Sequence, residues 1–342
     1  MEVTELKAKI DRGENGVYLF VGEEEYLKRH YLSLLKKKIV PDEFLEPFNY
    51  AFYDGGEIDF GKLLDALKSP PMMADNKLIV WKYPEIDKMR EKGRDALEEF
   101  GNMCKEYPYA TVVFFVGADA FDLGNLPKKP SKLYTRYAKV FDIVNFRTST
   151  DAQLISWLAR HLDAEGVKAD AETLRALLFR SGHSMDTLAS EVEKLAAYAK
   201  ANQLPCITPR EVELVASSTI ECDTFALSNA IGERNHALAF RVLSQMKLER
   251  IDPLVVLGML IRTYTELLSV STLMKEGKGA DEIASLTKIN AYKVKLAITS
   301  VKRSGHERIF RATKLLGEID AKAKSYTADT YALLERFLAV VL

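Results

Sequence analysis

Residues 17–28 read VYLFVGEEEYLK, an apolar run followed by one glycine, three glutamates and the start of a charged, helix-like stretch. The run Val17 to Val21 is continuously apolar, as expected for a parallel strand that is covered on both faces. In an α/β nucleotide-binding domain, the turn after such a strand carries the phosphate loop. The turn that begins at Gly22 therefore bears on both the fold class and nucleotide binding.

This turn lacks the features of a phosphate loop. Such a loop needs several glycines, then a lysine for the phosphates and a Ser or Thr for magnesium. Here the single Gly22 precedes carboxylates that would repel a triphosphate, and no Gly-Lys-Ser or Gly-Lys-Thr occurs in the sequence. A later apolar run continues into Lys82-Tyr83-Pro84, where an ATPase would place its magnesium-binding acids. We therefore expect no ATP hydrolysis, no cofactor and no catalytic residues.

The first 146 residues alternate short apolar runs with charged helical stretches, the pattern of an α/β domain with a parallel sheet. Further strands are predicted at 78–81, 111–116 and 140–144, and a fifth where Phe48, Tyr50 and Phe52 alternate with other residues. Helices are predicted at 24–38, 59–68 and 90–105. The turn-rich segment 117–132 is predicted to be an exposed connection.

From Thr148 onward the strand pattern stops and the helical period continues to the C-terminus. Thr150 with Gln153, and Thr208 with Glu211, have the spacing of a capping box at a helix start. A polar stretch begins at residue 217. We therefore predict a small helical domain at 147–216 and a second all-α domain at 217–342. Apolar stripes are predicted in two of its helices, at 254, 257, 261, 264 and 268, and at 309, 312, 316, 319 and 323.

The composition is typical of a soluble globular protein, with 47% apolar and 28% charged residues. Because 48 Lys and Arg face 49 Asp and Glu, no overall positive field draws the chain onto DNA by itself. The N-terminal residues lack a signal-peptide pattern, and no uninterrupted apolar run reaches the roughly 18 residues of a membrane span. We expect a cytoplasmic location.

Neither cysteines nor histidines form a recognisable metal motif. Cys104, Cys206 and Cys222 are scattered and odd in number, which favours reduced thiols packed as small apolar side chains. The five histidines never lie at i, i+4 or pair with a cysteine. We predict no metal site.

Four phrases, in this order along the chain, resemble the delta subunit of the bacterial DNA polymerase III clamp loader. They are YLFVGEEEYL at 18–27, MDTLASEVEKL at 185–195, FALSNAIG at 225–232 and IRTYTELL at 261–268. The resemblance implies a degenerate AAA+ module without a phosphate loop at 1–146, a helical lid at 147–216 and a helical collar for oligomerisation at 217–342.

The resemblance also implies a clamp-binding element in the first domain, where a helix and turn present two exposed apolar side chains before a strand. Met72 and Met73 fall at that position, with Pro71 and Leu67 beside them. Many relatives have Leu and Phe there, so two methionines are a departure. The alternative for Met72 and Met73 is that both pack in the core of their own domain.

The function implied is ATP-independent binding and opening of the sliding clamp, the beta ring, by a non-catalytic subunit of the holoenzyme. The implied partners are the clamp, the delta-prime and gamma or tau subunits, and primer-template DNA within the assembled complex only, with no membrane. One alternative is a nucleic-acid-dependent AAA+ ATPase resembling a helicase loader, which saturable ATP binding would favour. Another is an unrelated helical scaffold, which would not retain the clamp.

Overall fold

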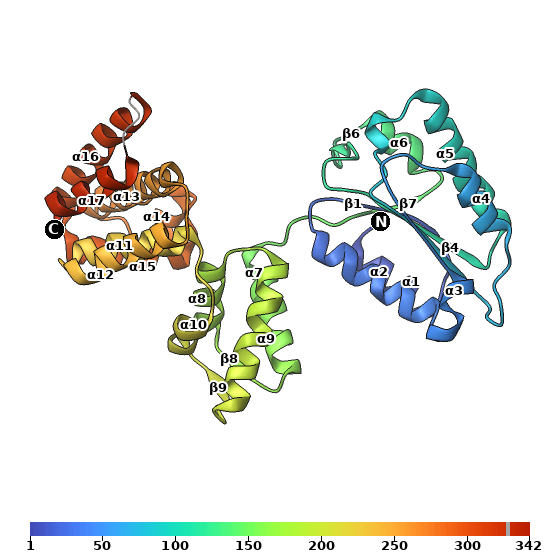
Figure 1. Cartoon of the computed structure of the whole chain (residues 1–342), viewed down its shortest axis with the longest axis horizontal. Helices are drawn as coiled ribbons and strands as arrows, with labels where there is room; N and C mark the ends of the chain where they lie inside the picture. Colours follow the sequence, from blue (N-terminus) through green and yellow to red (C-terminus); the bar gives the residue numbers. More distant parts are fainter. Residues whose placement is uncertain (326–328) are drawn as a thin grey trace. The chain divides into compact units, whose positions relative to one another are not determined.

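The computed structural model of the chain describes residues 1–325 and 329–342. These residues form two compact units, Met1–Thr150 and Asp151–Leu342 (Figure 1). The first unit contains a sheet with helices on both faces, and the second is built almost entirely of helices. This is the predicted fold class. The division of the second unit into a lid and a collar near residue 216 stays a prediction.

The sheet of the first unit has five parallel strands in the order β2-β3-β4-β1-β7. They span Tyr50–Asp54 (β2), Lys77–Lys82 (β3), Ala110–Phe115 (β4), Val17–Val21 (β1) and Asp142–Asn145 (β7). The strand β1 lies between β4 and β7, with Tyr18 level with Val113 and Asp142. Because it is covered on both faces, its side chains are apolar without alternation.

Helices cover both faces of this sheet (Figure 1). The helices α1 (Val3–Arg12) and α2 (Glu25–Ile39) pack against one face, where Tyr18 and Phe20 are buried. The helices α4 (Phe60–Lys68), α5 (Glu91–Met103) and α6 (Lys132–Tyr137) pack against the other, where Leu19 and Val21 are buried. The first unit therefore has three layers.

Several features of this unit were not predicted, including α6 and a short helix that contains Phe48, which was expected in the fifth strand. The helix α1 precedes the sheet, and its buried Leu6 and Ile10, four residues apart, are the only signal that the sequence offered. The connection at 117–132 contains a two-stranded hairpin. Its strands are β5 (Gly124–Asn125) and β6 (Lys129–Pro130). The remaining short helices are η1 (Glu43–Leu45), α3 (Glu46–Asn49), η2 (Ile86–Lys88) and η3 (Cys104–Glu106).

The second unit contains helices from α7 to α17. They span Asp151–Ala164 (α7), Ala171–Ser181 (α8), Met185–Ala201 (α9), Pro209–Val215 (α10), Ile220–Gly232 (α11), His236–Leu248 (α12), Pro253–Lys275 (α13), Ala280–Thr287 (α14), Ala291–Ser304 (α15), His306–Ser325 (α16) and Thr330–Val341 (α17). The capping box of Thr208 and Glu211 at the start of α10 is confirmed. Two short parallel strands, β8 (Lys168–Ala169) and β9 (Cys206–Ile207), were not predicted because two residues show no periodicity.

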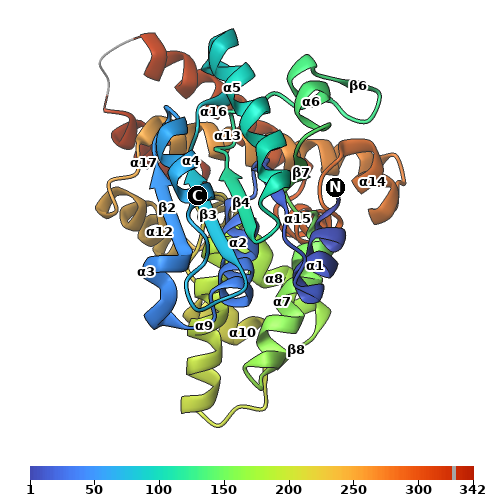
Figure 2. The same cartoon turned by 90° about the vertical axis from the view of Figure 1, so that its right-hand side faces the viewer.

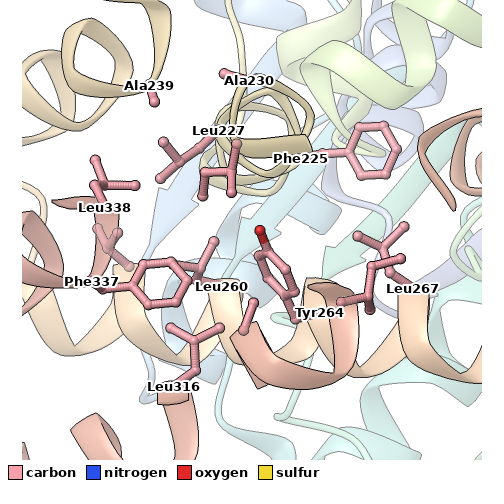
Figure 3. Packing of buried hydrophobic residues seen from close by; sticks show 14 of the residues in the cluster. Phe225, Leu227, Ala230, Ala239, Leu260, Tyr264, Leu267, Leu316, Phe337 and Leu338 are labelled. Atoms are coloured by element: carbon pink, nitrogen blue, oxygen red, sulfur yellow. The ribbon is translucent and has the colours of Figure 1, made fainter. Parts of the chain in front are cut away.

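The longest helix, α13, packs at the centre of the helical core of residues 225–342. Figure 3 shows Leu260 and Tyr264 among side chains from neighbouring helices, including Leu316 and Phe337. The helix α13 has 23 residues and contains an 18-residue window with a mean hydropathy of 1.4, so it is long and apolar enough to cross a membrane by length and composition alone. In this protein the buried face of α13 packs against other helices of the core.

The stripe predicted for α13 was partly wrong. Leu257 and Tyr264 are buried, but Leu254 is 49% exposed. The stripe predicted for α16 agrees with the structure, since its residues 309, 312, 316 and 319 are buried. Among the cysteines, Cys104 is buried and Cys222 is partly buried, whereas Cys206 is exposed, and all three are free thiols. The burial predicted for the cysteines therefore does not hold for Cys206.

Candidate functional site

The candidate site is the loop that connects α4 to β3, residues 69–76, which we call the methionine loop. Its tip exposes Met72 by 50% and Met73 by 87%. The alternative in which both methionines pack in their own core is therefore wrong. Pro71, directly before them, is half-buried. Figure 2 looks onto the first unit, in which α3, α4 and the edge strand β2 lie near one another.

Leu67 does not belong to the exposed surface. Its side chain is completely buried in the core between α4 and the sheet, together with Leu63 and Ala66. The family resemblance implied that Leu67 belongs to the clamp-binding element. Because its side chain is buried, Leu67 is not available for contact with a partner. Leu67 faces the sheet because Leu63, four residues earlier in the amphipathic helix, lies on the same face. Leu67 therefore fixes the last turn of α4, from which the loop starts.

The middle of the methionine loop is held by the side chain of Asn49, the last residue of α3. The Asn49 Nδ2 donates to the carbonyl oxygen of Met72 at 2.9 Å. The backbone N–H of Met72 donates to the Asn49 Oδ1 at 2.7 Å. Asn49 is completely buried, so its amide is satisfied by the loop and not by water. One side chain thus pairs with both polar groups of the Met72 backbone, much as a neighbouring strand would.

The start of the loop is held by two further buried or half-buried groups. The Lys77 Nζ donates to the carbonyl oxygen of Ser69 at 3.1 Å, and the Tyr109 hydroxyl donates to the carbonyl oxygen of Leu67 at 2.9 Å. Both acceptors lie at the C-terminal end of α4, where carbonyl groups lack partners within the helix and attract a cation. Lys77 is only 4% exposed, and this burial lowers the pKa of its ammonium group.

The end of the loop is held by Asn15, which precedes β1. Its Nδ2 donates to the Asn76 side chain and, at 2.8 Å, to the carbonyl oxygen of Pro108. Its Oδ1 accepts from the Thr111 hydroxyl at 2.8 Å. The loop therefore has attachments at its start, middle and end, and its conformation is fixed by residues from α3, β3, β4 and the segment before β1.

The backbone of Met73 has a φ of 51°, in the left-handed region that side chains other than glycine rarely adopt. This conformation costs about 1–2 kcal/mol per residue and persists only where the surroundings impose it. It turns the chain sharply at the tip of the loop. Strain at an exposed apolar residue is typical of a site that is shaped for binding.

The position of a phosphate loop, after β1, is closed by the protein itself. Gly22 has a φ of 103°, and a Cβ on it would lie 2.4 Å from the carbonyl oxygen of Phe146. The backbone N–H of Glu24 donates to that same oxygen at 3.0 Å. The turn therefore lies directly against the end of β7, and the backbone N–H of Glu24 is bonded within the protein.

A buried lysine fills the adjoining space at the ends of β1 and β4. The Lys28 side chain is completely buried, and its Nζ donates to the carbonyl oxygen of Val116 at 2.8 Å and to the Glu25 carboxylate. The same Nζ lies 5.0 Å from the centre of the Phe115 ring. Burial lowers the pKa of Lys28. The ammonium group thus stabilises the strand ends internally. Within residues 1–325 and 329–342, no three His, Cys, Asp or Glu side chains are arranged to hold a metal ion.

The chain matches one protein family along most of its length. Residues 18–130 match the family described as "DNA polymerase III, delta subunit", and residues 221–341 match "DNA polymerase III delta subunit, C-terminal domain". The DNA polymerase III subunit delta of Bacillus subtilis is 23% identical over 97% of this chain and 95% of its own length. The probable delta subunit of Aquifex aeolicus is 24% identical over 94% and 90%, respectively.

Among solved structures, the DNA clamp loader delta protein of Bacillus subtilis has the same fold. It superimposes with a TM-score of 0.55 and 20% sequence identity, covering 99% of both chains. The order of a parallel α/β domain followed by a largely helical region is thus shared along the entire length. On the two family matches, which together span both units, this chain belongs to the family of DNA polymerase III delta subunits.

Proposed function

We propose that this delta subunit binds the sliding clamp through Met72 and Met73 and opens the ring without hydrolysing ATP. The observation that carries the proposal is the methionine loop, where two exposed apolar side chains are held on a backbone with attachments at its start, middle and end. Methionine is unbranched and polarizable, so it adapts to an apolar pocket on a partner. The family supplies the partner, because delta subunits belong to the clamp loader.

The free energy available from this contact is sufficient to influence a ring. Burial of the exposed parts of the two methionines contributes at most roughly 3–6 kcal/mol before ordering costs are subtracted. A fixed loop keeps that cost small, because its conformers are already restricted before binding. The contact favours opening only if the loop binds the open ring better than the closed ring. The difference between the two binding free energies is the free energy that the subunit contributes to opening the ring.

The remaining parts of the proposal concern catalysis, assembly with other subunits and contact with DNA. We propose that the subunit is non-catalytic, which the Lys28 ammonium and the closed turn after β1 support. Assembly with delta-prime and gamma or tau subunits would use residues 217–342. Leu248, Leu286 and Phe310 expose 77%, 58% and 52% of their surface there. Contact with primer-template DNA would occur within this cytoplasmic assembly and not with the subunit alone.

The test is the affinity of the full chain for purified bacterial sliding clamp in the absence of nucleotide. We expect the wild-type chain to co-elute with the clamp from a sizing column. Met72→Ala with Met73→Ala should weaken the affinity at least about tenfold, equivalent to about 1.4 kcal/mol, with an unchanged circular dichroism spectrum.

The matched control removes two exposed apolar side chains elsewhere. Leu214 and Val340 are 68% and 65% exposed, and both lie in the second unit. Leu214→Ala with Val340→Ala should bind the clamp as the wild type does. Wild-type affinity of the methionine variant, or an equal loss in the control, would remove the assignment of the methionine loop.

A further inference from the structure

We propose that Asn49 is a positioning residue for clamp binding, which holds the tip of the methionine loop in the conformation that the clamp recognises. The inference rests on the proposed function of Met72 and Met73. It goes beyond that function by assigning a residue that touches no partner and acts through the backbone of Met72. Nothing in the sequence pattern around Asn49 indicated this role, since the neighbouring residues were read only as the start of a strand.

The geometry distinguishes Asn49 from the other attachments of the loop. Lys77 and Asn15 hold the two ends, whereas Asn49 holds Met72 itself. A primary amide has one acceptor and one donor side in a single plane, so two bonds to one residue fix the orientation of the backbone on both sides of its Cα. Only Met72, and through it the turn at Met73, is oriented by this pairing.

Asn49 is itself fixed by the sheet. It is completely buried, and the next residue, Tyr50, begins β2 and pairs with Leu78 of β3. The loop leads directly into that same strand β3 at Lys77. The amide therefore links the loop tip back to the strand pair from which the loop emerges. Through Asn49, the sheet restricts the backbone of Met72 and Met73, which lie in neither a helix nor a strand.

The expected benefit of the two hydrogen bonds is in binding more than in folding. The Met72 and Met73 side chains are exposed, so holding them adds little to the core of the free protein. Fixing a residue's backbone costs conformational entropy, and a loop that is fixed beforehand does not incur this cost when the clamp binds. Without Asn49, the loop tip would sample other conformers, and the apparent affinity would fall with the competent fraction.

The experiment is a double-mutant cycle on the full chain, with purified bacterial sliding clamp as the binding partner and no nucleotide. Asn49→Ala should weaken the affinity about tenfold if the competent conformer falls to about a tenth of molecules. In the background of Met72→Ala with Met73→Ala, the same substitution should change the affinity by less than about twofold, because there is no side chain left to position.

Hydrogen exchange at the Met72 backbone amide supplies a readout in the free protein. In the wild type this amide should exchange slowly although it belongs to an exposed loop, and Asn49→Ala should make it exchange rapidly. Ile143→Val is the matched control, since Ile143 is buried in β7 at the opposite edge of the sheet. It should lower the stability of the first unit while leaving the affinity and the Met72 exchange unchanged.

Asn49→Asp is the second variant, should the alanine variant not fold. It keeps the oxygen that accepts from the Met72 N–H and loses the donor to the Met72 carbonyl, so we expect the same direction of change. Wild-type affinity of the folded Asn49 variants, an equal loss with and without the methionines, or rapid wild-type exchange at Met72 would overturn the role of Asn49 alone. Wild-type affinity of the double methionine variant would instead overturn the proposed function, and the role of Asn49 with it.

Discussion

Three buried polar side chains hold the backbone of the first unit, two of them at the methionine loop and one at the end of β4. Asn49 and Lys77 satisfy backbone groups of the methionine loop, and Lys28 satisfies the end of β4. Each is paired, as burial requires, because an unpaired buried polar group costs about 1–3 kcal/mol. All three bond to backbone carbonyl groups, so they determine where the chain runs. Asn49 and Lys77 thus hold the methionine loop, and Met72 and Met73 are the side chains proposed to contact the clamp.

The left-handed backbone of Met73 leads to a prediction about stability. Met73→Gly should give a protein more stable than Met73→Ala by about 1 kcal/mol, because glycine adopts a φ of 51° without the steric penalty that alanine keeps. Urea denaturation of the two variants measures the difference. Both variants lack the Met73 side chain, so both should bind the clamp more weakly than the wild type. Equal stability of the two variants would contradict the strain inferred here.

At the scale of elements, the functional unit is a helix, a loop and a strand. The helix α4 packs its apolar face on the sheet through Leu63 and Leu67, and its C-terminal carbonyl groups are bound by Lys77 and Tyr109. The next strand, β3, lies between β2 and β4. Because both ends of the loop belong to well-packed elements, its span and direction are determined before any partner arrives.

Truncation of Leu67 should lower the stability of the first unit, whereas truncation of the exposed Met72 should not. Leu67→Ala should destabilise the first unit by about 2–5 kcal/mol, since it removes a completely buried side chain. Met72→Ala should change its stability little. Trp81 lies in β3 and Trp157 in α7, so fluorescence in a Trp157→Phe background reports on the first unit during urea unfolding. A Leu67→Ala variant as stable as the parent would show that Leu67 does not stabilise the packing of α4 on the sheet.

Helix α13 shows where sequence periodicity fails. Its buried residues do form one stripe at spacings of three and four, through Leu257, Leu260 and Leu267, but apolar residues also lie outside this stripe and displaced the predicted one around the helix. Leu254 was placed in the stripe but is half-exposed near the start of the helix. Helix α16 has one exposed side, and its stripe was predicted correctly. Periodicity thus predicts burial well only where few apolar residues lie outside the buried face.

At the scale of the whole molecule, the chain divides into two units after Thr150. Phe146 is buried in the first unit, whereas Arg147 and Thr148 are exposed and lie in neither a helix nor a strand. An exposed segment of this kind is a preferred site of proteolysis. The connection between the units is therefore expected to be the point at which a protease can act without unfolding either core.

Brief digestion with trypsin should release fragments 1–147 and 148–342, identified by mass spectrometry. Arg136 should resist cleavage, because its guanidinium group is bound by Glu91, Asp95 and Glu98 and it lies in α6. Arg147→Gln should abolish this pair of fragments and leave other products unchanged. Persistence of the same pair in Arg147→Gln would place the cut elsewhere.

Four features could be predicted from the order of residues alone: the strand at 17–21, the lack of a phosphate-loop pattern after it, the change to helices near residue 148 and the position of Met72 and Met73 before a strand. These features depend on residue type and spacing over a few neighbouring positions, which a single chain displays directly. Three others emerged only from the folded chain: Leu67 is buried, Asn49 bonds to Met72 across 23 residues, and Lys28 bonds to Val116 across 88. Such contacts depend on how strands and helices distant in sequence are brought together, and local patterns carry no record of that arrangement.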